Sequence, residues 1–141
     1  MYTVMIVDDE KAIRNNLPHA LDFRSLGFQV SAEAKNGRDA LEQLEKTPAD
    51  LVFLDVCMPV LDGVGFLREL SAWEEEKRPF VVMLSGYSEF EYARAAIRYG
   101  VKGYLLKPVD EDEAQSLLLD IRRELDERAQ RRAEAGIVER V

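Results

Sequence analysis

Apolar positions recur along this chain with two different periods. Five short runs are apolar and rich in β-branched or long aliphatic residues, which is typical of strands; they cover residues 3–7, 29–34, 51–54, 80–84 and 104–106. Between these runs the apolar residues recur every three or four positions, which predicts helices. Strands that alternate with helices favour βαβ units, in which helices cover a parallel sheet. The pattern therefore predicts an α/β fold with five strands and five helices.

The runs also differ in the burial that they predict. Val30, Ala32 and Ala34 alternate with polar residues, as expected for a half-exposed strand at the edge of a sheet. Residues 51–54 are apolar without alternation, which suits a central strand covered on both faces. We therefore expect the second run at an edge and the third in the middle.

The last two helices have recognisable ends. Ser88 and Glu91 have the spacing of a capping box, and Gly100 is expected to end the helix that they begin. The final helix is predicted to run from about Glu111 past Leu125. Residues 126–141 are rich in Arg, Glu and Ala and keep a high helix propensity. Because that segment is polar on most sides, we expect it to project from the domain as a helical tail or linker, or to pair with another chain; a frayed terminus is the alternative.

Composition excludes several classes of protein. The chain has 141 residues, which is the length of one domain, and is 47% apolar and 33% charged, which is globular composition. Its 27 acidic and 19 basic residues give a net charge of −8, so we expect this segment to bind neither nucleic acid nor an anionic membrane. The single cysteine and the absence of a signal sequence or long apolar run predict a cytoplasmic protein. The single histidine and the single cysteine exclude ordinary His/Cys zinc sites.

The chemistry is concentrated where the predicted strands end. Asp8 and Asp9 follow the first run, Asp55 the third, Ser85 the fourth and Lys107 the fifth. The carboxyl ends of parallel strands lie at one edge of a sheet, where ligands bind in open α/β folds. Each residue alone is typical of a turn or a helix cap, but the set is not. We expect these side chains to form one cleft.

The charges of this cleft predict a cation. Three carboxylates and one ammonium group leave two negative charges, and crowded carboxylates either raise their pKa values or bind a cation. An oxygen-only ligand set suits a hard divalent ion, and Mg²⁺ is the best match. Such a site can accept a phosphoryl group whose oxygens are shared by the metal, Lys107 and Ser85, with Asp55 as the nucleophile.

Four segments together resemble the receiver domain of two-component response regulators. They are VDDE (7–10), LDVCMPVLDG (54–63), LSGYSEFEYARAAIRYG (84–100) and KGYLLKPVD (102–110). The resemblance covers about residues 3–125, and it is strongest to receivers that precede AraC-type DNA-binding domains. It implies a doubly wound, five-stranded parallel sheet of the flavodoxin or CheY-like type, with strand order 2-1-3-4-5.

The resemblance also implies a role for each site residue. Asp55 is the phospho-acceptor, Lys107 pairs with the phosphoryl oxygens, and Ser85 moves to bond them. Mg²⁺ is held by Asp9, Asp55 and the backbone carbonyl of Cys57, and Asp8 supports it through water. The aromatic switch that follows Ser85 is Tyr104, and the Lys107–Pro108 peptide is cis. The side chain of Cys57 either tunes dephosphorylation or is simply a small buried hydrophobe.

The implied function is that of a signalling switch rather than an enzyme, with only weak self-phosphorylation and self-dephosphorylation. Its partner is a sensor histidine kinase, and its output, transcription regulation, passes through the surface of helix 4, strand 5 and helix 5, which is also a candidate homodimer interface. The helix 4 face that carries Tyr92, Ala95 and Tyr99 is either this partner surface or simply a face whose aromatic side chains lie flat on the helix. Residues 1–125 then form the receiver, and residues 126–141 lead toward a DNA-binding domain.

Three other functions remain compatible with parts of the sequence. A phosphatase of the haloacid-dehalogenase type also uses a strand-end Asp with Mg²⁺, but it normally has a second Asp where this chain has Cys57. A flavodoxin-like cofactor binder would place a phosphate loop after the first strand, where Asp8 and Asp9 would repel it. A degenerate receiver would act by binding alone.

Overall fold

The computed structural model, which describes residues 1–86 and 90–140, contains one parallel sheet in the order β2-β1-β3-β4-β5. The strands are β1 (Tyr2–Val7), β2 (Phe28–Ala34), β3 (Leu51–Asp55), β4 (Phe80–Ser85) and β5 (Gly103–Leu106). The described helices are α1 (Lys11–Ala20), α2 (Gly37–Lys46), α3 (Gly63–Leu70), α4 (Phe90–Arg98) and α5 (Glu111–Arg140), with a short 3₁₀ helix, η1 (Glu75–Lys77). The predicted α/β fold and its strand order are confirmed.

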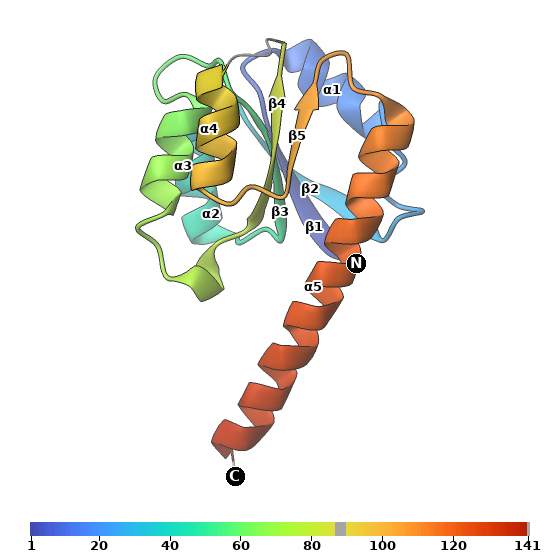
Figure 1. The fold of residues 1–141 in the computed structure, drawn as a ribbon, viewed down its shortest axis with the longest axis vertical. Coiled ribbons are helices and arrows are strands. Elements are labelled where there is room, and N and C mark those ends of the chain that lie inside the picture. The colour runs from blue at the N-terminus through green and yellow to red at the C-terminus, as the bar shows by residue number, and fades with distance from the viewer. Residues whose placement is uncertain (87–89, 141) are drawn as a thin grey trace.

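Helices cover both faces of the sheet. Helices α1 and α5 lie on one face, and α2, α3 and α4 lie on the other (Figure 1). The side chains of each strand alternate between these two layers. In β3, Leu51 and Phe53 pack in the α1/α5 core, whereas Val52 and Leu54 pack in the core of the opposite face. All of β3 is buried, so the prediction of a central strand is confirmed.

The second strand lies at an edge, as predicted. Strand β2 pairs with β1 alone, and its burial alternates between half-buried Val30 and Ala32 and exposed polar residues. At the other edge, β5 pairs with β4. A sheet with two edge strands and three inner strands places the ends of β1, β3 and β4 in its middle, where the polar residues gather.

Side chains cap the N-termini of α2 and α3. The side-chain oxygen of Asn36 accepts a hydrogen bond from the backbone N–H of Asp39, and that of Asp62 accepts one from Gly65, each at 2.8 Å. Gly100 has φ +64° and follows the end of α4, as the sequence predicted. The proposed cap at Ser88 lies outside the described residues.

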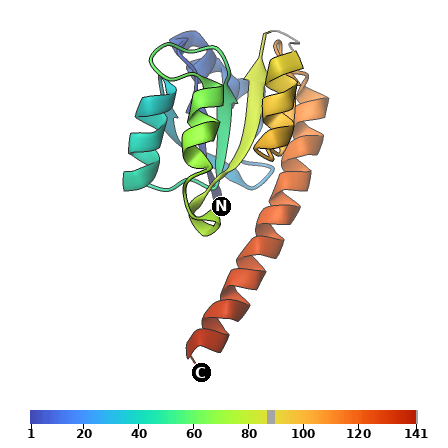
Figure 2. The ribbon, with the colours of Figure 1, turned by 60° about the vertical axis from the view of Figure 1, so that its left-hand side comes forward.

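Helix α5 is much longer than the domain needs. Its buried stripe consists of Ala114, Leu118, Ile121 and Leu125, and the helix then continues beyond the body of the domain (Figure 2). No helix in the described part of the chain is both long enough and apolar enough to cross a bilayer. The part of α5 beyond Leu125 is therefore a polar extension of the helix.

The first turns beyond Leu125 do not project freely, and on this point the sequence prediction is wrong. The Tyr2 hydroxyl donates a hydrogen bond to Asp126. Arg128 donates to the carbonyl of Arg78 at 3.3 Å, and Arg132 donates to the carbonyl of Glu76. Long side chains can reach backbone carbonyls across a gap, so a helix without an apolar stripe still contacts its own domain.

Candidate functional site

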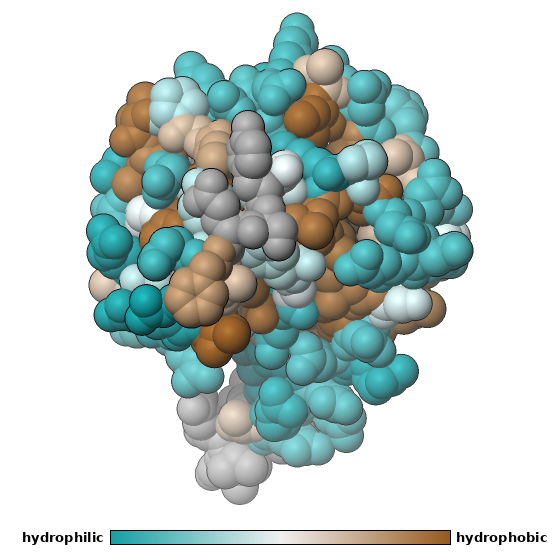
Figure 3. All heavy atoms as spheres, turned by 45° about the horizontal axis from the view of Figure 1, so that its top comes forward, coloured by the Kyte–Doolittle hydropathy of each residue, from teal (hydrophilic) through white to brown (hydrophobic). Residues whose placement is uncertain are grey.

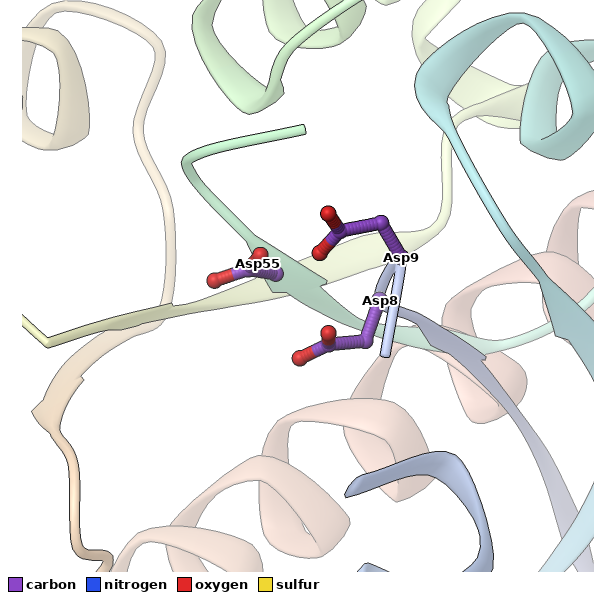
Figure 4. Close-up of side chains that lie close together, drawn as sticks. All are labelled: Asp8, Asp9 and Asp55. Atoms are coloured by element: carbon purple, nitrogen blue, oxygen red, sulfur yellow. The ribbon is translucent and has the colours of Figure 1, made fainter. Parts of the chain in front are cut away.

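Two neighbouring strands bring the three carboxylates together. Val7, the last residue of β1, pairs with Leu54 of β3, so Asp8 and Asp9 emerge beside Asp55. One carboxylate oxygen from each Asp lies within 4.8 Å of the others. Figure 4 shows the three side chains pointing into the same space at the ends of their strands. Asp8 and Asp55 are buried, whereas Asp9 is exposed.

Lys107 supplies the positive charge of this cluster. Its ammonium nitrogen lies 3.0 Å from a carboxylate oxygen of Asp8 and 3.0 Å from one of Asp55. The backbone N–H of Lys107 donates to the carbonyl of Ser85 at 2.8 Å, which fixes the end of β5 against the end of β4. The Lys107–Pro108 peptide is cis, as the resemblance implied.

Two groups that the sequence analysis missed hold Asp8 in place. The backbone N–H of Glu10 donates to a carboxylate oxygen of Asp8 at 2.9 Å. The guanidinium of Arg14 donates to the backbone carbonyl of Asp8 at 2.6 Å and lies 3.4 Å from the carboxylate of Glu33. Arg14 is one turn into α1, and its spacing from Asp8 gives no signal of this contact.

The negative charge of the cluster exceeds its positive charge. Burial raises the pKa of Asp55 from 3.8 to about 6, and the charges of Asp8 and Asp9 add to the rise, while Lys107 opposes it. Burial alone would lower the pKa of Lys107, but its hydrogen bonds to Asp55 and Asp8 outweigh burial and raise it. One ammonium group thus serves two buried carboxylates, and a further cation would be stabilised here.

A close backbone contact fixes the loop that follows Asp55. The N–H of Gly63 donates to the carbonyl of Val56 at 2.9 Å. A Cβ atom on Gly63 would lie 2.8 Å from the carbonyl oxygen of Asp55 and 2.9 Å from the Cα of Val56. Only glycine fits at this position without moving the strand end. The start of α3 is therefore held directly against the backbone of Asp55.

Ser85 and Tyr104 lie on the two strands next to this cluster. Ser85 is buried at the end of β4, one residue beyond Leu84, which pairs with Asp55. Tyr104 pairs with Met83 and packs, half-buried, on the core beneath α2, α3 and α4. Ser85 is thus close to the carboxylates in the sheet. Tyr104 lies farther from them, on the face of the sheet that α4 covers.

The structure corrects the interpretation of Cys57 and shows how the predicted α4 face lies. Cys57 is exposed, so its interpretation as a small buried hydrophobe is wrong; its sulfur lies 3.3 Å from the Tyr92 hydroxyl. Ala95 is buried, and Tyr92 and Tyr99 pack on the core. Tyr92 and Tyr99 are half-buried and keep part of their surface in solvent, so the role of this α4 face as a partner surface stays a prediction.

The exposed surface around the cluster is mixed in character. Figure 3 shows apolar and polar side chains side by side on the face above the strand ends. Val60, in the loop after β3, and Phe90, at the start of α4, are 80% and 74% exposed. A partner that approaches the carboxylates would meet both kinds of surface.

The family model for the response regulator receiver domain matches residues 4–119. The match includes most of β1, all of β2 to β5 and each of the clustered side chains. This chain belongs to the response regulator receiver family. Two curated relatives are the uncharacterized transcriptional regulatory protein YesN of Bacillus subtilis, 38% identical over 89% of this chain, and the transcriptional regulatory protein HptR of Staphylococcus aureus, 35% identical over 84%. The matches span 33% of YesN and 45% of HptR, so this receiver spans less than half the length of either relative.

Solved structures agree with this assignment. The receiver domain of AraT from Geobacillus stearothermophilus is 32% identical and superposes with a TM-score of 0.79, over 91% of this chain and 98% of that one. A CheY from Borrelia burgdorferi, solved in a complex with CheX, BeF₃ and Mg²⁺, is 26% identical with a TM-score of 0.72, over 85% of this chain and 88% of that one. The family and the fold of this receiver are therefore established together.

Proposed function

We propose that this receiver accepts a phosphoryl group on Asp55 from a phosphohistidine of a sensor histidine kinase. The observation that carries the proposal is the position of the Asp55 carboxylate, buried at the end of the central strand, 3.0 Å from Lys107 and beside two further carboxylates. Its pKa of about 6 leaves it largely ionised at neutral pH, as a nucleophile must be.

The transfer itself is a simple exchange of bonds. A carboxylate oxygen of Asp55 forms a bond to phosphorus as the phosphorus–nitrogen bond to the kinase imidazole breaks. The bonding electron pair stays on the imidazole nitrogen, which takes up a proton. Lys107 remains beside the product and offsets the charge that the phosphoryl group adds.

Mg²⁺ completes the site in this proposal. Asp9, Asp55 and the backbone carbonyl of Cys57 would hold it, and Asp8 would support it through water. The bound ion supplies positive charge for the transferring phosphoryl oxygens. Three carboxylates within 4.8 Å of one another, with one ammonium group among them, fit a hard divalent cation, and the structural neighbour CheY was solved with Mg²⁺.

The response to phosphorylation is proposed to pass through Ser85 and Tyr104. The Ser85 hydroxyl would turn to bond a phosphoryl oxygen, and the Tyr104 ring would move into the space that this leaves. This is a local change of charge that biases an element with two states. The half-buried position of Tyr104 on the α4 side of β5 supports this route.

The output surface is proposed to be the face formed by α4, β5 and α5. Four large apolar side chains are exposed on these elements: Phe90 and Ile97 on α4, Leu106 on β5 and Leu119 on α5. Exposed apolar side chains on adjacent elements are typical of a protein interface. We propose that a second receiver binds here when Asp55 is phosphorylated.

In the whole protein, residues 1–125 would be the receiver and residues 126–141 a helical linker to a DNA-binding output domain. The relatives YesN and HptR are named transcriptional regulatory proteins and are more than twice as long as the matched segment. Helix α5, which continues without a break to Arg140, is suited to such a linker.

Labelling by acetyl phosphate tests the proposal. The protein is incubated with acetyl phosphate and Mg²⁺, and the mass increase of a phosphoryl group is located by mass spectrometry. Asp55→Asn should abolish labelling, and EDTA should do the same in the unaltered protein. The control is Asp120→Asn, which removes an exposed carboxylate on α5, 3.6 Å from Arg123.

The alternatives give different results. Undiminished labelling of Asp55→Asn would contradict the assignment of the acceptor. A degenerate receiver would show neither labelling nor a response to beryllofluoride. A phosphatase would turn over phosphate esters many times, whereas we expect only slow loss of its own phosphoryl group.

A further inference from the structure

A cavity lies at the opposite end of the sheet from the carboxylates. It has a volume of about 430 Å³ and is bounded by the end of α3, the start of β4, the end of α4 and the outer part of α5. Figures 1 and 2 show that α5 leaves the domain at this end. The cations that line it are Arg78, Arg98, Lys102, Arg128 and Arg131, and Glu75 is the acidic residue among the lining side chains. We call it the arginine cavity.

Most of these charges are not neutralised. Lys102 lies 3.4 Å from the carboxylate of Glu124. Within residues 1–86 and 90–135, no carboxylate oxygen lies within 4.0 Å of the other four cations, which are all arginines. The chain as a whole carries a charge of −8, so this is a local reversal of its charge. Such a concentration of positive charge raises the local concentration of anions.

Two of the arginines are held in place by the backbone. Arg78 donates to the carbonyls of Trp73 at 2.8 Å and Ser71 at 2.7 Å. Arg128 donates to the carbonyl of Arg78, and its guanidinium lies 4.5 Å from the centre of the Phe80 ring, which Lys102 approaches to the same distance. These contacts fix one wall of the arginine cavity before any ligand arrives.

The fixed wall is electrostatically unfavourable as it stands. Burial lowers the pKa of Arg128, and the charge of Arg132 lowers it further. An anion in the cavity would offset both effects through its attraction to the guanidinium group. Arg98 and Arg131 are exposed and extend from α4 and α5, so each can turn toward a ligand.

We propose that the arginine cavity binds a small phosphorylated molecule with two or more negative charges. The planar guanidinium group matches two oxygens of a phosphate at once, which an ammonium group does not. The volume lies in the range of small-ligand sites, roughly 300–1,000 Å³. The site is concave and bounded by four elements, so a small molecule fits it better than the convex backbone of duplex DNA.

The position of the cavity gives this binding a consequence. A ligand held by Arg98 and Arg131 joins the end of α4 to the outer part of α5. It would therefore stabilise the extension of α5 against the domain. This inference does not depend on phosphotransfer at Asp55, which lies at the other end of the sheet.

Calorimetric titration with inorganic pyrophosphate tests the inference. The buffer contains EDTA, so that no divalent ion draws pyrophosphate to the carboxylates. We expect saturable binding of one pyrophosphate per chain. The double variant Arg98→Gln/Arg131→Gln should bind about tenfold more weakly or worse, which corresponds to about 1.4 kcal/mol. Neither side chain donates a hydrogen bond to a described group, and Arg98 lies 5.6 Å from the centre of the neighbouring Tyr99 ring. We expect the fold to be retained, and a circular dichroism melt checks this.

The matched control removes the same number of positive charges, one from α4 and one from α5. Arg94→Gln/Arg123→Gln alters α4 and α5 at exposed positions outside the cavity, where each arginine pairs with a carboxylate three residues away. This control should bind pyrophosphate as the unaltered protein does.

Several results would overturn the inference. Equal weakening in the two double variants would indicate a general effect of charge. Absence of saturable heat, or equal affinity for sulfate and pyrophosphate, would exclude a site for a phosphorylated molecule. Binding of a short DNA duplex that depends on Arg98 and Arg131, without binding of pyrophosphate, would assign the cavity to nucleic acid instead.

Discussion

The ammonium nitrogen of Lys107 lies 3.0 Å from a carboxylate oxygen of Asp55, a residue 52 positions earlier in the chain. The same nitrogen lies 3.0 Å from Asp8, so one positive charge is divided between two buried carboxylates. With Asp9 nearby, the cluster holds two negative charges in excess. This excess of negative charge lowers the stability of the folded protein and favours the binding of a cation. The free energy of unfolding should therefore change with pH, and also when the charge of Asp55 or of Lys107 is removed.

Asp55→Asn should stabilise the metal-free protein, and the gain should depend on pH. The pKa of Asp55 is raised to about 6 on folding, so its protonated form favours the folded state below about pH 4 and this contribution is lost as the pH rises through 6. Asparagine carries no such charge. The gain should be near zero at pH 4 and reach at most about 3 kcal/mol above pH 7. Urea unfolding in EDTA measures it, and a gain that does not change with pH would contradict the buried charge as its cause.

Lys107→Met should have opposite effects on stability and on metal binding. Removal of the ammonium group leaves Asp8 and Asp55 without their shared partner, which should cost about 2 kcal/mol at pH 7 in EDTA. The same change increases the negative charge of the site, so Mg²⁺ should bind several-fold more tightly by calorimetry. Lys46→Met, at the exposed end of α2, is the control and should change neither quantity. Weaker Mg²⁺ binding in Lys107→Met would show that the carboxylates need Lys107 to keep their positions.

Gly63→Ala should destabilise the protein by about 1–2 kcal/mol, because its Cβ would strike the backbone of Asp55 and Val56. Acetyl phosphate labelling should slow as well, since the contact is with the residue that carries the acceptor. The control is Gly86→Ala: among the described residues, no atom lies within 4 Å of the Cβ that this adds. The control should stay within about 0.5 kcal/mol of the unaltered protein. If the two variants unfold at the same urea concentration, the close contact does not limit the fold.

Truncation of α5 should separate its anchored part from the remainder. Deletion of residues 133–141 keeps the contacts of Asp126, Arg128 and Arg132 with the domain and should leave the urea midpoint unchanged. Deletion of residues 126–141 removes them and should cost about 1 kcal/mol. Circular dichroism should show loss of helix in both truncations. Equal stability of the two would mean that these contacts contribute nothing in solution.

Much of the site could be predicted from the order of residues alone. Polar residues that follow apolar strands must meet at one edge of a parallel sheet, whatever the details of packing. That rule was enough to bring Asp8, Asp55 and Lys107 together, and the structure places them in contact. The continuous apolar run of β3 likewise required burial on both faces, so its central position followed from its composition.

Other features depend on contacts between distant segments, which periodicity does not encode. Cys57 is exposed and Tyr92 packs on the core, and their residue types allow either outcome. Helix α5 has no apolar stripe beyond Leu125, yet Arg128 reaches the carbonyl of Arg78, 50 positions away.

The sequence by itself determined the strands, their burial and the acidic edge, because strand periodicity and the direction of a parallel sheet are properties of each βαβ unit. Only the tertiary structure decided where the arginines of α4 and α5 lie, since five cations spread over residues 78–131 form one cavity only when four elements converge. A polar surface residue has many positions of similar free energy, and the packing of its neighbours selects among them.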